Sequence, residues 1–131
     1  MPYGETTSDE IERVGAAIVD ASFVVHKRFG PGLLESVYKA CLAAELRKRG
    51  FVVVREMKVP IYYDEIELDE GFRIDLLVDD LVIVEVKAVE RMIPVFDAQL
   101  LTYLRLTNKR LGYLINFNVP LIKNGIKRII N

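Results

Sequence analysis

The most informative stretch of hydrophobic and polar positions runs from Phe72 to Val89 and reads FRIDLLVDDLVIVEVKAV. Two apolar runs, each the length of a short strand, flank the acidic pair Asp79-Asp80. This pattern predicts two buried strands joined as a hairpin. Three charged residues, Asp75, Glu85 and Lys87, interrupt the apolar runs. Because an unpaired charge inside a protein costs several kcal/mol, we expect these side chains to share a compensating partner such as a divalent cation.

The connection between the two strands decides whether the acidic side chains meet. Residues two apart on a strand share a face, so Glu85 and Lys87 point the same way. A two-residue turn would pair Asp75 with Val84 and send Glu85 to the opposite face. A three-residue connection through residues 79–81, or a β-bulge, brings Asp75 and Glu85 together, and we expect one of these two. The alternative is a tight hairpin whose charges only protect an edge strand from unwanted pairing.

Two helices are predicted before this hairpin. The first follows a capping-box sequence at Thr7–Glu10, extends to about Arg28 and stops where residues 30–32 read Gly-Pro-Gly. The second runs over about 33–49 and ends at Gly50, which suits the end of a helix. Their expected buried stripes are Ile11, Val14, Ile18, Ser22 and Val25 in the first helix and Leu34, Val37, Cys41 and Ala44 in the second.

The remaining pattern predicts strands around one further helix. A long strand covers about 51–63, with a break, bulge or edge position at Pro60 because proline cannot donate to a ladder. The chain then continues as strand and turn over 62–68 and closes at Glu70-Gly71. The expected order is completed by a helix that begins at Pro94, a strand over 111–117 and a final edge strand over 122–130 with a turn at Asn124-Gly125.

Composition bounds the class of protein. The 131 residues are 51% hydrophobic and 28% charged, which predicts one globular domain over residues 1–131 with residues 1–6 as a frayed terminus. The net charge is −1, so a basic surface for nucleic acid has to be local. The acidic residues between positions 64 and 70 would repel nucleic acid, and we place them away from the candidate site.

The cysteine count and the apolar run lengths bear on the cellular location. The only cysteine, Cys41, excludes an intrachain disulfide and a cysteine metal cluster. No apolar run is long enough for a membrane span, and no signal peptide is visible. The expected location is therefore cytoplasmic, without a membrane partner.

Several motifs resemble those of a known protein family. Asp75, nine intervening residues and then Glu85-Val86-Lys87 resemble the Asp…(Asp/Glu)-x-Lys signature of the PD-(D/E)XK nuclease superfamily, although its proline is absent. The segment Gly32–Tyr38 resembles the motif that names the GxxExxY family, a branch of that superfamily. Residues 99–104 and 112–117 also resemble this family, so the resemblance extends from about Val25 to the C-terminus.

The resemblance implies an α/β fold, with a PD-(D/E)XK nuclease-like mixed sheet flanked by helices in the order α-α-β-β-β-α-β and an optional last strand. It also implies phosphodiester hydrolysis with Mg²⁺ or Mn²⁺, both of which favour oxygen ligands. Lys87 would position the attacking water or stabilise the transition state. The implied metal ligands are Asp75, Glu85 and the backbone carbonyl of Val86.

Four further residues are candidates for the same site. From its position in the sequence, Glu35 is an acidic residue that stabilises the start of a helix. The resemblance instead suggests that it is a further acidic ligand or catalytic group. In nucleases of this type a glutamine on the helix after the lysine strand often lies beside the site, and Gln99 takes that position. Tyr38 and Tyr103 are supporting candidates, with a core tyrosine as the alternative for Tyr38.

Nucleic acid, with DNA favoured, is the expected substrate. A local basic bias in the C-terminal third is the candidate phosphate-contacting surface, although solubilising charge explains it nearly as well. Its residues are Arg105, Lys109, Arg110, Lys123, Lys127 and Arg128.

Two other functions stay open. The first is a nuclease-fold module that has lost cleavage and binds nucleic acid or a protein. Near-zero net charge favours it, and the three charged residues of the hairpin oppose it. The second is an oligomeric accessory protein, in which Tyr62, Tyr63 and the C-terminal strand would form an edge-to-edge homodimer interface.

Overall fold

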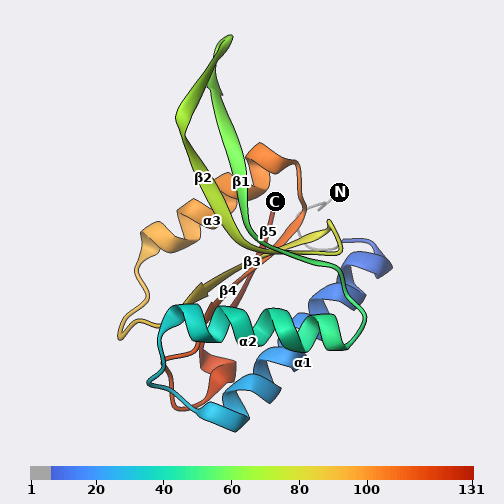
Figure 1. Ribbon diagram of the computed structural model, residues 1–131, viewed down its shortest axis with the longest axis vertical. Coiled ribbons are helices and arrows are strands. Elements are labelled where there is room, and N and C mark those ends of the chain that lie inside the picture. Colours follow the sequence, from blue (N-terminus) through green and yellow to red (C-terminus); the bar gives the residue numbers. More distant parts are fainter. Residues whose placement is uncertain (1–6) are drawn as a thin grey trace.

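The computed structural model describes residues 7–131, so the expected frayed terminus at 1–6 lies outside the described residues. The described chain forms a mixed five-stranded sheet with helices on both faces (Figure 1). This is the α/β architecture and element order that the sequence predicted. The strands are β1 (Val53–Tyr63), β2 (Ile66–Val78), β3 (Val82–Lys87), β4 (Leu111–Asn116) and β5 (Ile126–Ile130). The helices are α1 (Asp9–Phe29), α2 (Glu35–Lys48) and α3 (Pro94–Thr107), with a short 3₁₀ helix η1 (Ile122–Asn124).

The strands lie in chain order across the sheet, from β1 at one edge to β5 at the other. β3 and β4 are parallel, and every other neighbouring pair is antiparallel. A parallel pair needs a crossover connection, and α3 provides it between β3 and β4. β3 and β4 are almost continuously apolar because helices cover both of their faces.

Each face of the sheet has its own hydrophobic core. α1 and α2 cover one face, where Ile18, Leu42 and Phe117 are fully buried. α3 covers the other face, where Leu100 and Leu104 pack on the sheet. None of the helices in the described part of the chain is long and apolar enough to cross a membrane.

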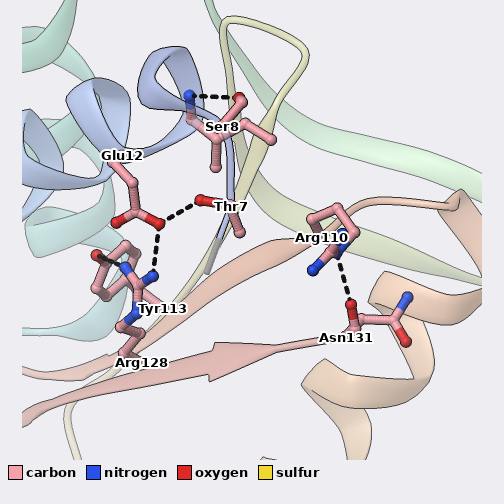
Figure 2. Close-up of polar contacts among 8 residues, drawn as sticks. Thr7, Ser8, Glu12, Arg110, Tyr113, Arg128 and Asn131 are labelled. Atoms are coloured by element: carbon pink, nitrogen blue, oxygen red, sulfur yellow. Dashed lines mark hydrogen bonds and ion pairs between the residues drawn. The ribbon is translucent and has the colours of Figure 1, made fainter. Parts of the chain in front are cut away.

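The start of α1 differs from the prediction by one residue. Ser8, not Thr7, is the N-cap, and its hydroxyl accepts a hydrogen bond from the backbone N–H of Ile11 at 3.2 Å. The hydroxyl of Thr7 instead donates to Glu12, which also pairs with Arg128 of β5 at 2.7 Å (Figure 2). Thr7 therefore serves an ion pair between the first helix and the last strand.

The buried face of α2 is also different from the predicted stripe. Its buried residues are Tyr38, Lys39, Leu42, Ala43 and Leu46. Of the predicted stripe, the residues at positions 34, 37 and 44 are exposed and the one at 41 is half-buried. The prediction failed because alanines and other apolar residues lie on several sides of this helix, so the sequence pattern alone did not select one face.

The hairpin of β1 and β2 extends well beyond the helices, and we call its residues 57–74 the arm (Figure 1). The register shifts between Val59 and Ile61, which confirms the irregularity expected at Pro60. The hairpin turns after Tyr63, so the closure expected at Glu70-Gly71 is wrong. Gly71 lies inside β2 instead, where a Cβ atom would come within 2.5 Å of the carbonyl oxygen of Val59. The glycine therefore serves a bulge rather than a turn.

The C-terminal segment contains the edge strand and the turn that were expected, but the strand begins later than predicted. The strand expected over 122–130 is split into η1 and β5, with Gly125 between them. Gly125 is buried, and a Cβ atom there would lie 2.1 Å from the carbonyl oxygen of Asn116. The chain therefore approaches β4 so closely at this point that it has to turn before β5 begins.

Candidate active site

The connection between β2 and β3 has the length that brings the two acidic side chains together. Val78 pairs with Val82 and Leu76 with Val84, which leaves residues 79–81 as the connection. Asp79 and Asp80 in that connection have φ values of 51° and 57°, a left-handed conformation that aspartate tolerates better than most residues. The three-residue alternative is therefore confirmed, and the next pair in this register is Asp75 with Glu85.

At this next pair, side chains replace the regular ladder. The backbone pairing of β2 with β3 ends at Leu76 and Val84. Beyond it, the N–H of Asp75 donates to Oε2 of Glu85, and the N–H of Val86 donates to Oδ2 of Asp75, both at 2.8 Å. Each carboxylate thus accepts a hydrogen bond from the opposite strand. The sheet itself holds the two acidic groups next to each other.

A residue with an unusual backbone conformation lies in β1 at the same level as Asp75. Glu56 of β1 has a φ of 52°, which is uncommon for a residue other than glycine. Leu76 packs in the core under α1 and α2, whereas Ile74 packs in the core under α3. Asp75 lies between these two residues. Residues two apart on a regular strand share a face, so β2 twists at Asp75 from one core to the other. The Asp75 side chain is therefore placed at the split between β2 and β3 rather than on one face.

Lys39 of α2 reaches this split from the helical side. Its Nζ lies 2.6 Å from Oε1 of Glu56 and 3.0 Å from Oδ1 of Asp75. Lys39 is only 8% exposed. Burial on its own would lower the pKa of Lys39, but the hydrogen bonds to Glu56 and Asp75 outweigh burial and the pKa is raised. Asp75 therefore has a charged partner within the protein itself.

Glu85 is in a different electrostatic situation. It is 7% exposed, and burial together with the nearby charge of Asp75 raises its pKa to about 8. The hydrogen bond from the N–H of Asp75 and the charges of Lys87 and Lys39 oppose this shift. A buried acid with a raised pKa binds a proton more readily, and a cation placed beside it favours the carboxylate form instead.

Lys87 and α3 form the other wall of the site. The Nζ of Lys87 lies 4.3 Å from the centre of the Phe96 ring, a cation–π distance. Tyr103 stacks on Phe72 of the arm at 4.1 Å. Burial raises the pKa of Tyr103, and the charges of Glu85 and Asp75 raise it further.

Gln99 lies one turn before Tyr103 and is exposed. Together with Tyr103 and Phe72 it lines a hollow of about 290 Å³ between α3 and the arm. Gln99 thus lies near Tyr103, on the side of α3 that faces the arm.

The end of β3 is held rigidly in place by Asn116 of β4. The side-chain oxygen of Asn116 accepts from the N–H groups of Val89 and Asn118, each at 3.1 Å. Its amide nitrogen donates to the carbonyl of Val89 at 2.9 Å, and the N–H of Phe117 donates to the carbonyl of Lys87 at 2.9 Å. These contacts position the backbone that carries Lys87.

Tyr38 lies in the core between the sheet, α1 and α2. It is fully buried and stacks on Phe117 at 4.7 Å. Its hydroxyl donates to the carbonyl of Gly30 at 2.5 Å and accepts from the N–H of Leu33 at 3.1 Å. The preceding Gly32 has a φ of 109°, which side chains rarely allow. This part of the resemblance motif thus shapes the loop between α1 and α2.

Glu35 is the first residue of α2 and is half-buried. Within residues 7–131, no group of three or more His, Cys, Asp or Glu side chains is placed to hold a metal ion. The structure therefore does not join Glu35 to Asp75 and Glu85 as a third acidic ligand.

The donor set of the site nevertheless suits one hard cation. Mg²⁺ is typically held by one or two carboxylates, with water and substrate phosphate oxygens completing its coordination. Asp75 and Glu85 provide two such carboxylates, and Val86 lies beside them through its hydrogen bond to Asp75. The residues present therefore fit Mg²⁺ or Mn²⁺ without a third acidic side chain.

The proposed phosphate-contacting surface is partly neutralised within the protein. Lys109 pairs with Asp80 at 3.1 Å, and Lys127 pairs with Asp97. Arg128 pairs with Glu12, and Arg110 donates to the terminal backbone carbonyl of Asn131 at 2.8 Å (Figure 2). The two other candidates, Arg105 and Lys123, are exposed.

A separate apolar hollow of about 340 Å³ lies between α1 and the segment before η1. His26 lines it, and a ring nitrogen of His26 lies 2.7 Å from the carbonyl oxygen of Val119. The histidine is thus engaged with the backbone, and neither Asp75 nor Glu85 lines this hollow.

Sequence reasoning missed Lys39, Glu56 and Phe96. A signal for Lys39 was present, because it lies at helical spacing with Leu42 and Leu46 and so places a charge inside an apolar stripe. A charge inside an apolar run is also the feature that identified Asp75 as a candidate. Glu56 carries no such signal, since nothing in its neighbourhood predicts a left-handed backbone.

Comparison with known proteins agrees with this geometry. The family model of the PD-(D/E)XK nuclease superfamily matches residues 12–129. The chain therefore belongs to this superfamily. No curated protein and no solved structure matches it.

Proposed function

We propose that the protein is a nuclease that hydrolyses phosphodiester bonds in nucleic acid, with DNA as the expected substrate, and that it depends on Mg²⁺ or Mn²⁺. We place it in the GxxExxY branch of its superfamily on the strength of the segment Gly32–Tyr38. One observation supports the proposal above all. Asp75 and Glu85 meet where two buried strands separate, and Lys87 follows on the same strand.

Asp75 and Glu85 would hold the cation between β2 and β3, with the carbonyl of Val86 as the further candidate ligand. When bound, the cation lowers the pKa of a water molecule and neutralises charge on the phosphate. The raised pKa of Glu85, about 8, means that it has to release a proton when it becomes a ligand. Cation binding is therefore expected to be stronger at higher pH.

Lys87 would act on the reacting groups. Its ammonium is held over Phe96 and extends from the strand that carries Glu85. From there it can position the attacking water or stabilise the negative charge that develops on the phosphate. Tyr103 and Gln99, on the adjoining side of α3, are proposed to contact the substrate next to the scissile bond.

Metal-dependent cleavage by purified protein tests the proposal. We expect Lys87→Ala and Asp75→Asn each to reduce cleavage of DNA by about 10²-fold or more, because each removes a charge that acts in the transition state. Lys48→Ala is the matched control, since Lys48 is exposed at the end of α2. Circular dichroism should show that all three variants remain folded. Undiminished cleavage by Lys87→Ala would contradict the assignment.

A binding module without cleavage is the second candidate, because Lys39 supplies Asp75 with a positive charge from within the protein. If the protein only binds, wild-type protein should retard the migration of DNA in a gel in the presence of EDTA, Mg²⁺ or Mn²⁺. The DNA should stay intact under all three conditions. Cleavage that appears only with a divalent cation would exclude this alternative.

A further inference from the structure

A lysine inside an apolar helix face needs an explanation. Lys39 lies on the buried side of α2 with Leu42 and Leu46, and its whole residue is only 8% exposed. Placing an ammonium there is costly unless it is paired and hydrogen-bonded. Its partners are not on its own helix, since Glu56 belongs to β1 and Asp75 to β2. The side chain therefore connects α2 to the split in the sheet.

The contacts of Asp75 show what this connection achieves. One carboxylate oxygen, Oδ1, lies 3.0 Å from Nζ of Lys39. The other, Oδ2, accepts from the N–H of Val86 at 2.8 Å. Each oxygen thus has a different partner on a different element, which leaves the carboxylate little freedom to rotate. A carboxylate that is held in this way needs no rearrangement before a cation binds.

The position of the ammonium is equally informative. It lies between two carboxylates, 2.6 Å from Glu56 and 3.0 Å from Asp75. In two-metal chemistry, two divalent ions about 3.5–4 Å apart stabilise the attacking and the leaving oxygens, so both have to fit into one site. Here one side of Asp75 is already taken by a positive charge that belongs to the protein. The side toward Glu85 is the one that remains for a divalent ion.

We propose that Lys39 is a positioning residue that acts as a built-in cation: it orients Asp75 and restricts the site to a single divalent ion. This inference rests on the proposed function. Two positive charges close to one carboxylate repel each other, so Lys39 weakens ion binding while it keeps the ligand oriented. Removal of Lys39 should therefore produce tighter ion binding together with slower cleavage, a combination that simple loss of structure does not produce.

Titration calorimetry with Mn²⁺ in the absence of nucleic acid tests whether removal of Lys39 tightens ion binding. We expect one ion per wild-type chain and, for Lys39→Met, an affinity higher by about tenfold or more. Lys39→Arg keeps the charge and should bind Mn²⁺ within about threefold of wild type. Lys48→Met removes an exposed lysine from the same helix and should change nothing. Asp75→Asn should abolish binding, which identifies the site.

Two further measurements test whether Lys39 orients Asp75 and thereby speeds cleavage. In EDTA, the side-chain carboxyl carbon of Asp75 should shift in the NMR spectrum of Lys39→Met and stay unchanged in Lys48→Met. With Mn²⁺ at saturation, Lys39→Met should cleave DNA at least about tenfold more slowly, and Lys39→Arg should recover part of the rate.

The outcomes separate this inference from the proposed function. If wild-type protein binds one Mn²⁺ and Lys39→Met binds it with equal or lower affinity, the proposed role of Lys39 as a built-in cation is wrong. The nuclease proposal then still stands. If wild-type protein binds two ions, the restriction to one ion is likewise overturned. If wild-type protein binds no Mn²⁺, the proposed function and this inference fail together.

Discussion

Two groups of ion pairs in this protein use the same chemistry in opposite environments. At the split of the sheet, the side chains of Lys39 and Asp75 are 11% and 14% exposed. In the C-terminal region, the side chains of Lys127 and Asp97 are 58% and 34% exposed. Water and salt screen the exposed pair, whereas the buried pair is surrounded by helix and sheet.

The comparison shows that burial, not the number of charges, distinguishes the candidate site from the C-terminal region. The C-terminal region carries more basic residues, yet three of them, Lys109, Lys127 and Arg128, are paired with acidic side chains at the surface. The split of the sheet holds fewer charges but holds them in fixed positions. Fixed charges that are poorly hydrated are the ones that can bind a cation and act on a phosphate.

The largest expected effect concerns pH and Glu85. Its pKa in the folded protein is about 8, compared with 4.5 for the ordinary group. Between these values the folded state keeps a proton that the unfolded state loses, so the free energy of unfolding should fall as pH rises from about 4.5 to 8. At about 1.4 kcal/mol per unit of pKa, the total is a few kcal/mol. Glu85→Gln should lack this decline in urea denaturation with EDTA present.

An identical pH dependence of the wild-type protein and Glu85→Gln would contradict the raised pKa. Asp80→Asn is a suitable control, because the Asp80 side chain is 83% exposed and its removal should leave the decline in place.

The next effect compares the two lysines directly. Lys39→Met leaves Asp75 without its charged partner in a poorly hydrated place, and we expect a loss of about 2–4 kcal/mol in the free energy of unfolding at pH 7. Lys127→Met should cost about 0.5 kcal/mol or less, because its pair with Asp97 is exposed. Chemical denaturation of both variants in EDTA measures the difference. Equal losses would remove the distinction between the two regions.

Salt should separate the same two pairs by a smaller amount. A double-mutant cycle with Lys127→Met and Asp97→Asn should give a coupling energy that nearly vanishes at about 1 M NaCl, where the screening length is only about 3 Å. The cycle with Lys39→Met and Asp75→Asn should keep most of its coupling energy under the same conditions. Loss of both couplings at high salt would show that water reaches the split of the sheet.

The smallest effect is expected at the first helix. A hydrogen bond from Arg128 lowers the pKa of Glu12, with a further contribution from Thr7. Because the folded pKa is lowered, the pair stabilises the protein above the unfolded pKa, and this contribution is lost as pH falls through the folded pKa. Glu12→Gln should therefore cost about 0.5 kcal/mol or less at pH 7 and less still at pH 3. This pH trend is opposite in sign to that of Glu85, and thermal melts at the two pH values would detect it.

The sequence by itself predicted the order of the elements and the meeting of Asp75 with Glu85, and the register of β2 with β3 then decided against the two-residue turn that was the alternative. Both predictions depend on local spacing, because the two acids flank one short connection and the apolar runs on either side allow only a buried hairpin. The bulge at Pro60 was predictable for the same reason, since proline cannot take part in a regular ladder. The turn at Glu70-Gly71 was not, because glycine serves bulges as well as turns.

The tertiary structure alone decided how the site is completed. α2 has apolar residues on several sides, so only its packing on α1 and the sheet selected the face that carries Lys39 inward. The left-handed backbone at Glu56 depends on where the hairpin has to pass from one core to the other. Both choices come from contacts between segments distant in the chain, and a sequence pattern records only the neighbours of each residue.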